Sequence, residues 1–147
     1  MISTKGRYAL RVMIDLAEHT GSAPVPLKDV AQRQGISKKY LEIIVKDLVN
    51  AKLVSGTSGK GGGYKLLRDA SDYTVGEIIE SAEGPLNSVA CLLDDAEPCE
   101  RAPFCQTLPI WAEFDQLVHD FFYSKKLDAL VDTKPDYFKE IRNKING

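Results

Sequence analysis

The segment LKDVAQRQGISKKYLEIIVKDLV, residues 27–49, carries the clearest indication of the fold. Its apolar residues fall into two short runs, each spaced at the three- and four-residue intervals of one buried helix face. Gly35 separates the two runs, and Ser37 stands where a cap for the second helix is needed. We therefore predict a helix over residues 27–33 and a second one that begins after Ser37. Two short helices joined by a turn that contains glycine form a helix-turn-helix.

The second helix of this pair has an unusual outer face. Its exposed positions are polar or basic, namely Ser37, Lys38, Lys39, Glu42 and Lys46. Such residues at the start of a helix suit the base edges and phosphates of a DNA major groove. A solvated helix surface would have the same composition, and Tyr40 is compatible with either DNA contact or core packing.

Directly behind the helix-turn-helix, two β-prone segments flank the glycine-rich run GTSGKGGG at residues 56–63. This pattern predicts a hairpin, and a hairpin in that position is the wing of a winged helix. Its five glycines allow another chain to approach the backbone closely. Lys60 at the tip is expected to reach a phosphate or the minor groove. A nucleotide phosphate loop is excluded, because Gly61 follows Lys60 where a hydroxyl residue is required.

The remaining helices complete a mainly α fold with a small β-wing. Residues 4–19 predict an amphipathic helix capped by Ser3 or Thr4, and the pair Thr74 and Glu77 predicts a capping box that opens another helix. From residue 108 a long helix carries a broad aromatic stripe, which favours a dimer interface. We expect a winged helix-turn-helix domain over residues 1–84, a cysteine-bearing loop over 85–107, a dimerisation helix over 108–130 and a C-terminal tail, with a terminal helix from Lys134, over 131–147.

Charge is distributed unevenly along the 147 residues, although the net charge is only −2. Residues 1–68 hold 12 Lys and Arg against 5 Asp and Glu, whereas residues 69–147 hold 7 against 16. The first part therefore offers a basic face to a polyanion. Charged residues interrupt the first nineteen positions, and the longest apolar run, at residues 89–93, is far shorter than a membrane span. We expect a cytoplasmic protein without a membrane partner.

All three cysteines, Cys91, Cys99 and Cys105, lie within fifteen residues of one another. In a cytoplasmic protein such clustering indicates metal or redox chemistry. An iron–sulfur cluster, a zinc site, a thiol switch and idle cysteines all remain open on spacing alone, although the closer pairs usual in zinc sites are absent. An enzyme is disfavoured, because no C-x-x-C pair occurs and neither His19 nor His119 has a companion nucleophile.

Several motifs in order resemble one family over about residues 1–130. They are ISTKGRYA at residues 2–9, QGIS at 34–37, YLE at 40–42, GGGY at 61–64 and VGEII at 75–79. Together they resemble the winged-helix transcriptional regulators that include IscR, NsrR and CymR. The resemblance implies a homodimer whose long helix crosses between subunits. It also implies binding to a pseudo-palindromic double-stranded DNA operator, usually as a repressor.

The resemblance also assigns roles to the cysteines and shows two departures. Cys91, Cys99 and Cys105 match the loop cysteines that ligate an iron–sulfur cluster in some members, with 2Fe–2S favoured over 4Fe–4S. Leu108 stands where IscR-like proteins have a histidine ligand, which leaves the fourth ligand open. Ser58 replaces the arginine common in the wing.

A cluster-free mode remains an alternative. The segment EGPL at residues 83–86 is closer to CymR, a regulator of cysteine metabolism that acts by binding a cysteine-biosynthesis enzyme.

The expected DNA-binding residues are Lys5, Arg7, Lys28, Ser37, Lys38, Lys39, Tyr40, Glu42, Lys46, Ser58 and Lys60. The dimer is expected to place its two recognition helices in successive major grooves about one helical turn apart. Lys5, Arg7, Lys46 and Lys60 would mainly neutralise phosphates. Glu42 is suited to accept a hydrogen bond from a cytosine amino group and to repel other bases.

Overall fold

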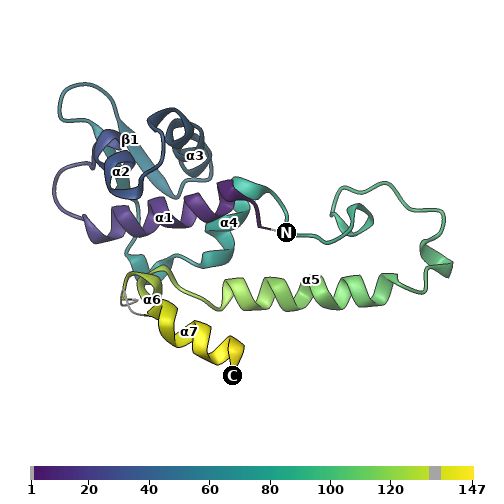
Figure 1. The fold of residues 1–147 in the computed structure, drawn as a ribbon. Helices are drawn as coiled ribbons and strands as arrows, with labels where there is room; N and C mark the ends of the chain where they lie inside the picture. The colour runs from purple at the N-terminus through teal and green to yellow at the C-terminus, as the bar shows by residue number, and fades with distance from the viewer. Residues whose placement is uncertain (1, 133–136) are drawn as a thin grey trace.

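The structure of the chain, a computed structural model, describes residues 2–132 and 137–147. The first four helices and a hairpin form one packed unit, and a long helix extends away from it, with an irregular loop beyond its far end (Figure 1). In chain order the helices and strands are α1 (Thr4–Glu18), α2 (Leu27–Gln34), α3 (Lys38–Asn50), β1 (Val54–Thr57), β2 (Gly63–Leu66), α4 (Val75–Glu83), α5 (Leu108–Tyr123), α6 (Leu127–Val131) and α7 (Tyr137–Asn146). Single 3₁₀ turns lie at Ala70–Asp72, Ala90–Leu92 and Ala102–Phe104.

The helix-turn-helix forms as its sequence predicts. Gly35 ends α2 with φ 63°, a left-handed conformation in which a side chain would be strained. The Ser37 hydroxyl accepts a hydrogen bond of 3.2 Å from the Tyr40 amide and so caps α3. The inward faces of α1 and α3 bury Val12, Met13, Leu41, Ile44 and Leu48 at the centre of the core. Burial of these side chains fixes α3 against α1, with the polar face of α3 outward.

The wing is a two-stranded antiparallel hairpin, in which Val54 pairs with Leu66 and Thr57 with Gly63. Val25 adds one more pair of backbone hydrogen bonds to β2, through Tyr64 at 2.9 Å each. A Cβ atom on Gly63 would lie 2.2 Å from the Val25 carbonyl oxygen, so only glycine fits there. The close backbone approach at Gly63 is therefore to the chain's own residues before α2.

Tyr73 anchors the base of the wing, and its ring is fully buried. Its hydroxyl donates to the Leu53 carbonyl at 2.6 Å and accepts from the amides of Leu67 and Arg68 at 2.9 and 3.0 Å. The Arg68 guanidinium lies 4.2 Å from the centre of the same ring. One side chain thus ties together the segments that enter and leave the hairpin.

The predicted capping box opens α4, with the Thr74 hydroxyl accepting from the Glu77 amide and the Glu77 carboxylate accepting from the Thr74 amide. The C-terminal end of α5 then packs on α4. Gly76 makes room for the ring of Tyr123, whose hydroxyl donates to Glu80 at 2.6 Å. Burial and this hydrogen bond raise the pKa of Tyr123 to about 12, so the hydroxyl stays a donor.

The long helix ends at Tyr123, short of residue 130, where we predicted the dimerisation helix to end. The chain turns at Ser124, and Lys126 pairs with Thr74 across the packed unit. Leu127 is then fully buried at the start of the short helix α6, which packs on α1. These long-range contacts, which the local pattern does not encode, interrupt the helix. The predicted start of the terminal helix, residues 133–136, lies outside the described residues, and α7 begins at Tyr137.

None of the side chains of α5 is buried, although the helix is fully described. Its exposed large apolar residues are Ile110, Trp111, Phe114, Leu117 and Phe121, with Leu117 64% and Ile110 60% accessible. In the single chain these apolar side chains remain exposed to water, which is typical of a surface that binds another protein. Across the described residues, no helix is long and apolar enough to span a membrane.

Candidate nucleic-acid interface and cysteine loop

The polar face of α3 is free on the surface of the protein. Lys38, Lys39, Glu42 and Lys46 are all exposed, and so is Lys28 at the start of α2. The Ser37 hydroxyl already accepts the helix cap bond, so its lone pairs are shared between that cap and any further partner. The structure thus gathers cationic side chains around the first two turns of α3, where a recognition helix contacts DNA.

The sequence leaves open whether Tyr40 contacts DNA or packs in the core, and the structure places it at the boundary of the core and the surface. It is half-buried, and its ring meets the edge of Tyr8 with centroids 5.7 Å apart. Part of the ring therefore belongs to the packing between α1 and α3.

The two basic residues at the start of α1 differ in their surroundings. Lys5 makes an ion pair of 2.5 Å with Asp47 of α3, which sequence analysis had not predicted. Arg7 is exposed, and its guanidinium donates to the Thr4 hydroxyl at 3.2 Å. A phosphate at Lys5 would have to share the ammonium group with Asp47. The spacing of residues 5 and 47 gives no signal that could have revealed this pair.

The tip of the wing projects from the packed unit (Figure 1), and its residues Ser58 and Lys60 are exposed. The Tyr73 hydroxyl holds the base of the hairpin through its bond to the Leu53 carbonyl. Tyr73 is the residue that sequence analysis missed here. In the sequence Tyr73 stands between a polar run and the capping box, where nothing distinguishes it from any other aromatic residue of a loop.

Residues 84–107 form the irregular loop that carries the three cysteines. Cys91 and Cys99 are exposed and Cys105 is partly buried, and all three are free thiols. A hydrogen bond with Thr107 at 3.4 Å lowers the pKa of the Cys105 thiol, which favours its thiolate. Thiolates are the ligands that iron–sulfur clusters and soft metals require, so the donor set fits such a group in its chemistry.

The donors are not assembled in this conformation. In the described parts of the chain, no group of three or more His, Cys, Asp and Glu side chains is placed to hold a metal ion. Leu108 opens α5 and offers no ligand, and Glu113 lies exposed further along the helix. His119 stacks on Tyr123 near the opposite end of α5, with ring centroids 4.3 Å apart.

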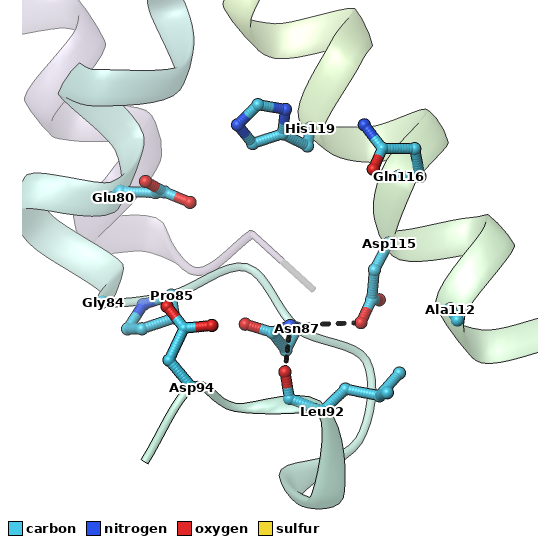
Figure 2. A pocket seen from close by; sticks show the side chains of 10 residues that line it. All are labelled: Glu80, Gly84, Pro85, Asn87, Leu92, Asp94, Ala112, Asp115, Gln116 and His119. Atoms are coloured by element: carbon cyan, nitrogen blue, oxygen red, sulfur yellow. Dashed lines mark hydrogen bonds between the residues drawn. The ribbon is translucent and has the colours of Figure 1, made fainter. Parts of the chain in front are cut away.

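A cavity of about 680 Å³ lies between the start of the loop, α5 and α4. Figure 2 shows Asp115 of α5 bonded to Asn87 on one side of it, with Glu80 and His119 on the other side. Asp115 accepts hydrogen bonds from the Ser88 amide at 2.8 Å and from the Asn87 side chain at 3.3 Å. Asp115 therefore fastens the start of the loop to α5.

The end of α4, just before the loop, is fastened to the start of α1. Glu83, the last residue of α4, accepts from the Ser3 amide at 2.8 Å, the Ser3 hydroxyl at 2.6 Å and the Gly6 amide at 3.0 Å. Partial burial raises the pKa of this carboxyl, but the bonds from Ser3 and Gly6 outweigh it and lower the pKa below the usual range. A carboxylate at the start of α1 also complements the helix dipole.

A helix-turn-helix with a wing directly behind it defines a winged-helix DNA-binding protein. The family model Rrf2, described as an iron-dependent transcriptional regulator, matches residues 2–133. The regulator IscR of Pectobacterium atrosepticum is 36% identical over 133 residues, which cover 90% of this chain and 80% of that protein. IscR of Xenorhabdus nematophila is 38% identical over 130 residues, 88% of this chain and 78% of that protein.

Two solved structures agree with these relatives. CymR, described as the global cysteine regulator of B. subtilis, superposes with a TM-score of 0.71 at 38% identity, covering 91% of this chain and 98% of that one. IscR of T. potens gives a TM-score of 0.70 at 32% identity, covering 95% and 96%. The chain belongs to the Rrf2 family of winged-helix transcriptional regulators. The prediction that it is not an enzyme is confirmed, since its relatives are named as transcriptional regulators.

Proposed function

We propose that the protein is a homodimeric repressor whose operator affinity depends on an iron–sulfur cluster held by Cys91, Cys99 and Cys105. The observation that carries the proposal is the placement of three free thiols on one loop, between the DNA-binding unit and an uncovered apolar helix. A cluster bound there would supply a group that responds to iron supply, oxygen or nitric oxide.

The apolar stripe of α5 supports the dimer. Trp111, Phe114 and Leu117 are each more than a third exposed, although such side chains usually gain by burial. Pairing with the same helix of a second copy would cover the stripe, as expected for a symmetric interface. The two recognition helices would then be set at a fixed spacing, which suits a pseudo-palindromic operator.

Two contacts near the start of the loop support its coupling to DNA binding. Asp115 of α5 binds Ser88 in the loop, and Glu83, the residue just before the loop, binds the start of α1. Lys5, close to the Glu83 contacts, is paired with Asp47 on the recognition helix. A change in the loop would therefore bear on both the dimer helix and α3, in a coupling that typically amounts to about 1–3 kcal/mol.

The test combines spectroscopy with DNA binding. Protein purified without oxygen is examined for visible charge-transfer bands and for bound iron and sulfide. We expect a brown protein whose colour is lost in Cys99→Ala and kept in the control Gln106→Ala. Operator affinity should differ between cluster-bound and cluster-free protein by about 5- to 150-fold. Protein that stays colourless and iron-free after reconstitution would contradict the cluster and favour the thiol-switch or enzyme-binding mode suggested by the CymR-like segment.

The DNA face is tested with two variants of exposed residues. Lys60→Ala should weaken binding to all sequences alike and flatten the dependence of affinity on salt, because a phosphate contact releases counterions. Glu42→Ala should relax sequence choice with a smaller loss of affinity. Equal losses on every DNA sequence in Glu42→Ala would contradict the selective role of that carboxylate.

A further inference from the structure

Asp15 in the middle of α1 has an environment that none of the DNA contacts explains. It is fully buried, and it is the only buried charged residue among the side chains that the structure describes. Its Oδ1 accepts from Arg33 Nη2 at 2.7 Å, and its Oδ2 accepts from Arg33 Nε at 3.0 Å. The same Oδ2 accepts from Gln34 Nε2 at 2.8 Å. The Asp15 carboxylate thus forms a bidentate ion pair with Arg33 and accepts a third hydrogen bond from Gln34.

Arg33 and Gln34 are the last two residues of α2, immediately before the turn of the helix-turn-helix. Arg11, one turn before Asp15 on α1, donates to the Gln34 side chain at 3.1 Å and also to the Gln34 backbone carbonyl. Every polar group of Gln34 that faces α1 is therefore engaged. These contacts fix the point at which the chain leaves α2 for α3.

The same face of α1 also contacts the residues that follow the turn, in the first turn of α3. The Arg11 guanidinium lies 5.1 Å from the ring centre of Tyr8, and Tyr8 meets the edge of Tyr40 in the first turn of α3. Tyr8, Arg11 and Asp15 are spaced by three and four residues, so they lie on one helix face. One face of α1 consequently holds both the last residues of α2 and the first turn of α3.

The surroundings of Arg33 argue against a phosphate contact. Its hydrogen bonds to Asp15 raise its pKa, and attraction to Asp29 and Glu18 adds to the rise. Burial alone would raise the pKa of Asp15, but the bonds from Arg33 and Gln34 hold it below the usual range. Ion pairs that bury a charge, as this one buries the Asp15 carboxylate, contribute little net stability compared with apolar packing, and their best-supported use is to specify one arrangement.

We infer that Asp15, Arg33, Gln34 and Arg11 form a positioning network that sets the angle of the recognition helix and thereby the choice of operator. Arg33 acts as a positioning residue and leaves the phosphates to Lys46 and Lys60. The inference rests on the proposed operator binding. It adds residues that determine specificity without touching DNA, because a fixed α3 angle is required before side chains can discriminate base edges.

The test compares Arg33→Gln, Arg33→Lys and the control Lys46→Gln in the full-length protein. Affinities for the operator and for unrelated DNA of equal length are measured over a series of salt concentrations. Both Arg33 variants should lower the ratio of operator to unrelated affinity about tenfold and leave the salt slope unchanged. Lysine cannot restore the ratio because it lacks the planar fork that Asp15 binds. Lys46→Gln should lower the salt slope by about 0.9 per protomer with little change in the ratio.

A milder pair of variants covers the case in which Arg33→Gln folds poorly. Gln34→Ala removes two of the side-chain hydrogen bonds and should lower the affinity ratio about threefold. The control Gln32→Ala changes an exposed residue of the same helix and should leave the ratio unchanged.

Three results would overturn the inference. A lower salt slope in Arg33→Gln that Arg33→Lys restores would make Arg33 a phosphate ligand. A lower melting temperature with an unchanged affinity ratio would make the network merely structural. A wild-type protein that binds the operator and unrelated DNA equally well would overturn the proposed function and this role together. The affinities of the wild-type protein are enough to recognise that case, without any variant.

Discussion

The unit formed by residues 3–83 and the segment formed by residues 84–123 differ in how far their side chains are buried. In the first, apolar side chains such as Val12, Leu41 and Ile78 are fully buried, and the polar groups that enter the interior are paired. In the second, no side chain of α5 is buried, and the three thiols of the loop lie at or near the surface. The first part therefore completes its core within one chain, whereas the second leaves the apolar side chains of α5 exposed, as the proposed dimer requires.

The largest expected effect separates the two regions directly. Leu41→Ala removes a fully buried side chain and should lower the free energy of unfolding by about 2–5 kcal/mol through lost burial and a cavity. The matched change Ile110→Ala on α5 should cost less than about 0.5 kcal/mol in the monomer. Chemical denaturation at a concentration where sedimentation shows monomer measures both. Equal costs would mean that α5 is packed within its own chain.

The wing provides the next test. Tyr73→Phe removes a hydroxyl that satisfies one carbonyl and two amides, and it should cost about 1–3 kcal/mol. Hydrogen exchange at the wing amides should rise together with the loss of stability. The control Tyr64→Phe removes a hydroxyl that makes no hydrogen bond among the described residues. A wing that exchanges no faster in Tyr73→Phe would show that backbone pairing alone holds it.

Placing a charge on the uncovered stripe should break the association of α5. Leu117→Asp should raise the dissociation constant of the dimer at least tenfold, about 1.4 kcal/mol, because the carboxylate would lose its water at the interface. Gln116→Glu adds a charge on the face of α5 that lines the cavity and should leave the dimer intact. Sedimentation velocity measures both. A dimer that survives Leu117→Asp would move the interface away from this stripe.

The smallest effect concerns the contact that holds the end of α4 to the start of α1. The pKa of Glu83 is lower in the folded protein than its usual 4.5, so near pH 4 the unfolded chain binds more protons. The stabilisation is present above about pH 4.5 and is lost as the pH falls through the lowered value. Denaturation between pH 6 and pH 3 should therefore show a shallower loss of stability in Glu83→Gln than in the wild-type protein. The exposed loop residue Glu97 serves as the control, since Glu97→Gln should leave the pH profile unchanged.

Prediction from sequence worked best where local chemistry decides the structure. Ser37 caps α3, Gly35 ends α2 and Thr74 forms the capping box, because each of these bonds joins residues no more than four positions apart. It failed where contacts join distant segments. The break after Tyr123 depends on Thr74 and Lys126, which are far apart in sequence, and the pairing of Lys5 with Asp47 has no local signal.

The helix-turn-helix, the polar face of α3, the wing and the clustering of the cysteines could all be predicted from the amino-acid sequence alone. They follow from periodicity, capping residues and composition, which are local properties of a chain. The anchoring of the wing by Tyr73, the hold of Asp15 on the turn before α3 and the exposure of α5 become visible only in the folded chain. The reason is physical, because burial and the pairing of polar groups depend on which distant segments meet in the folded chain.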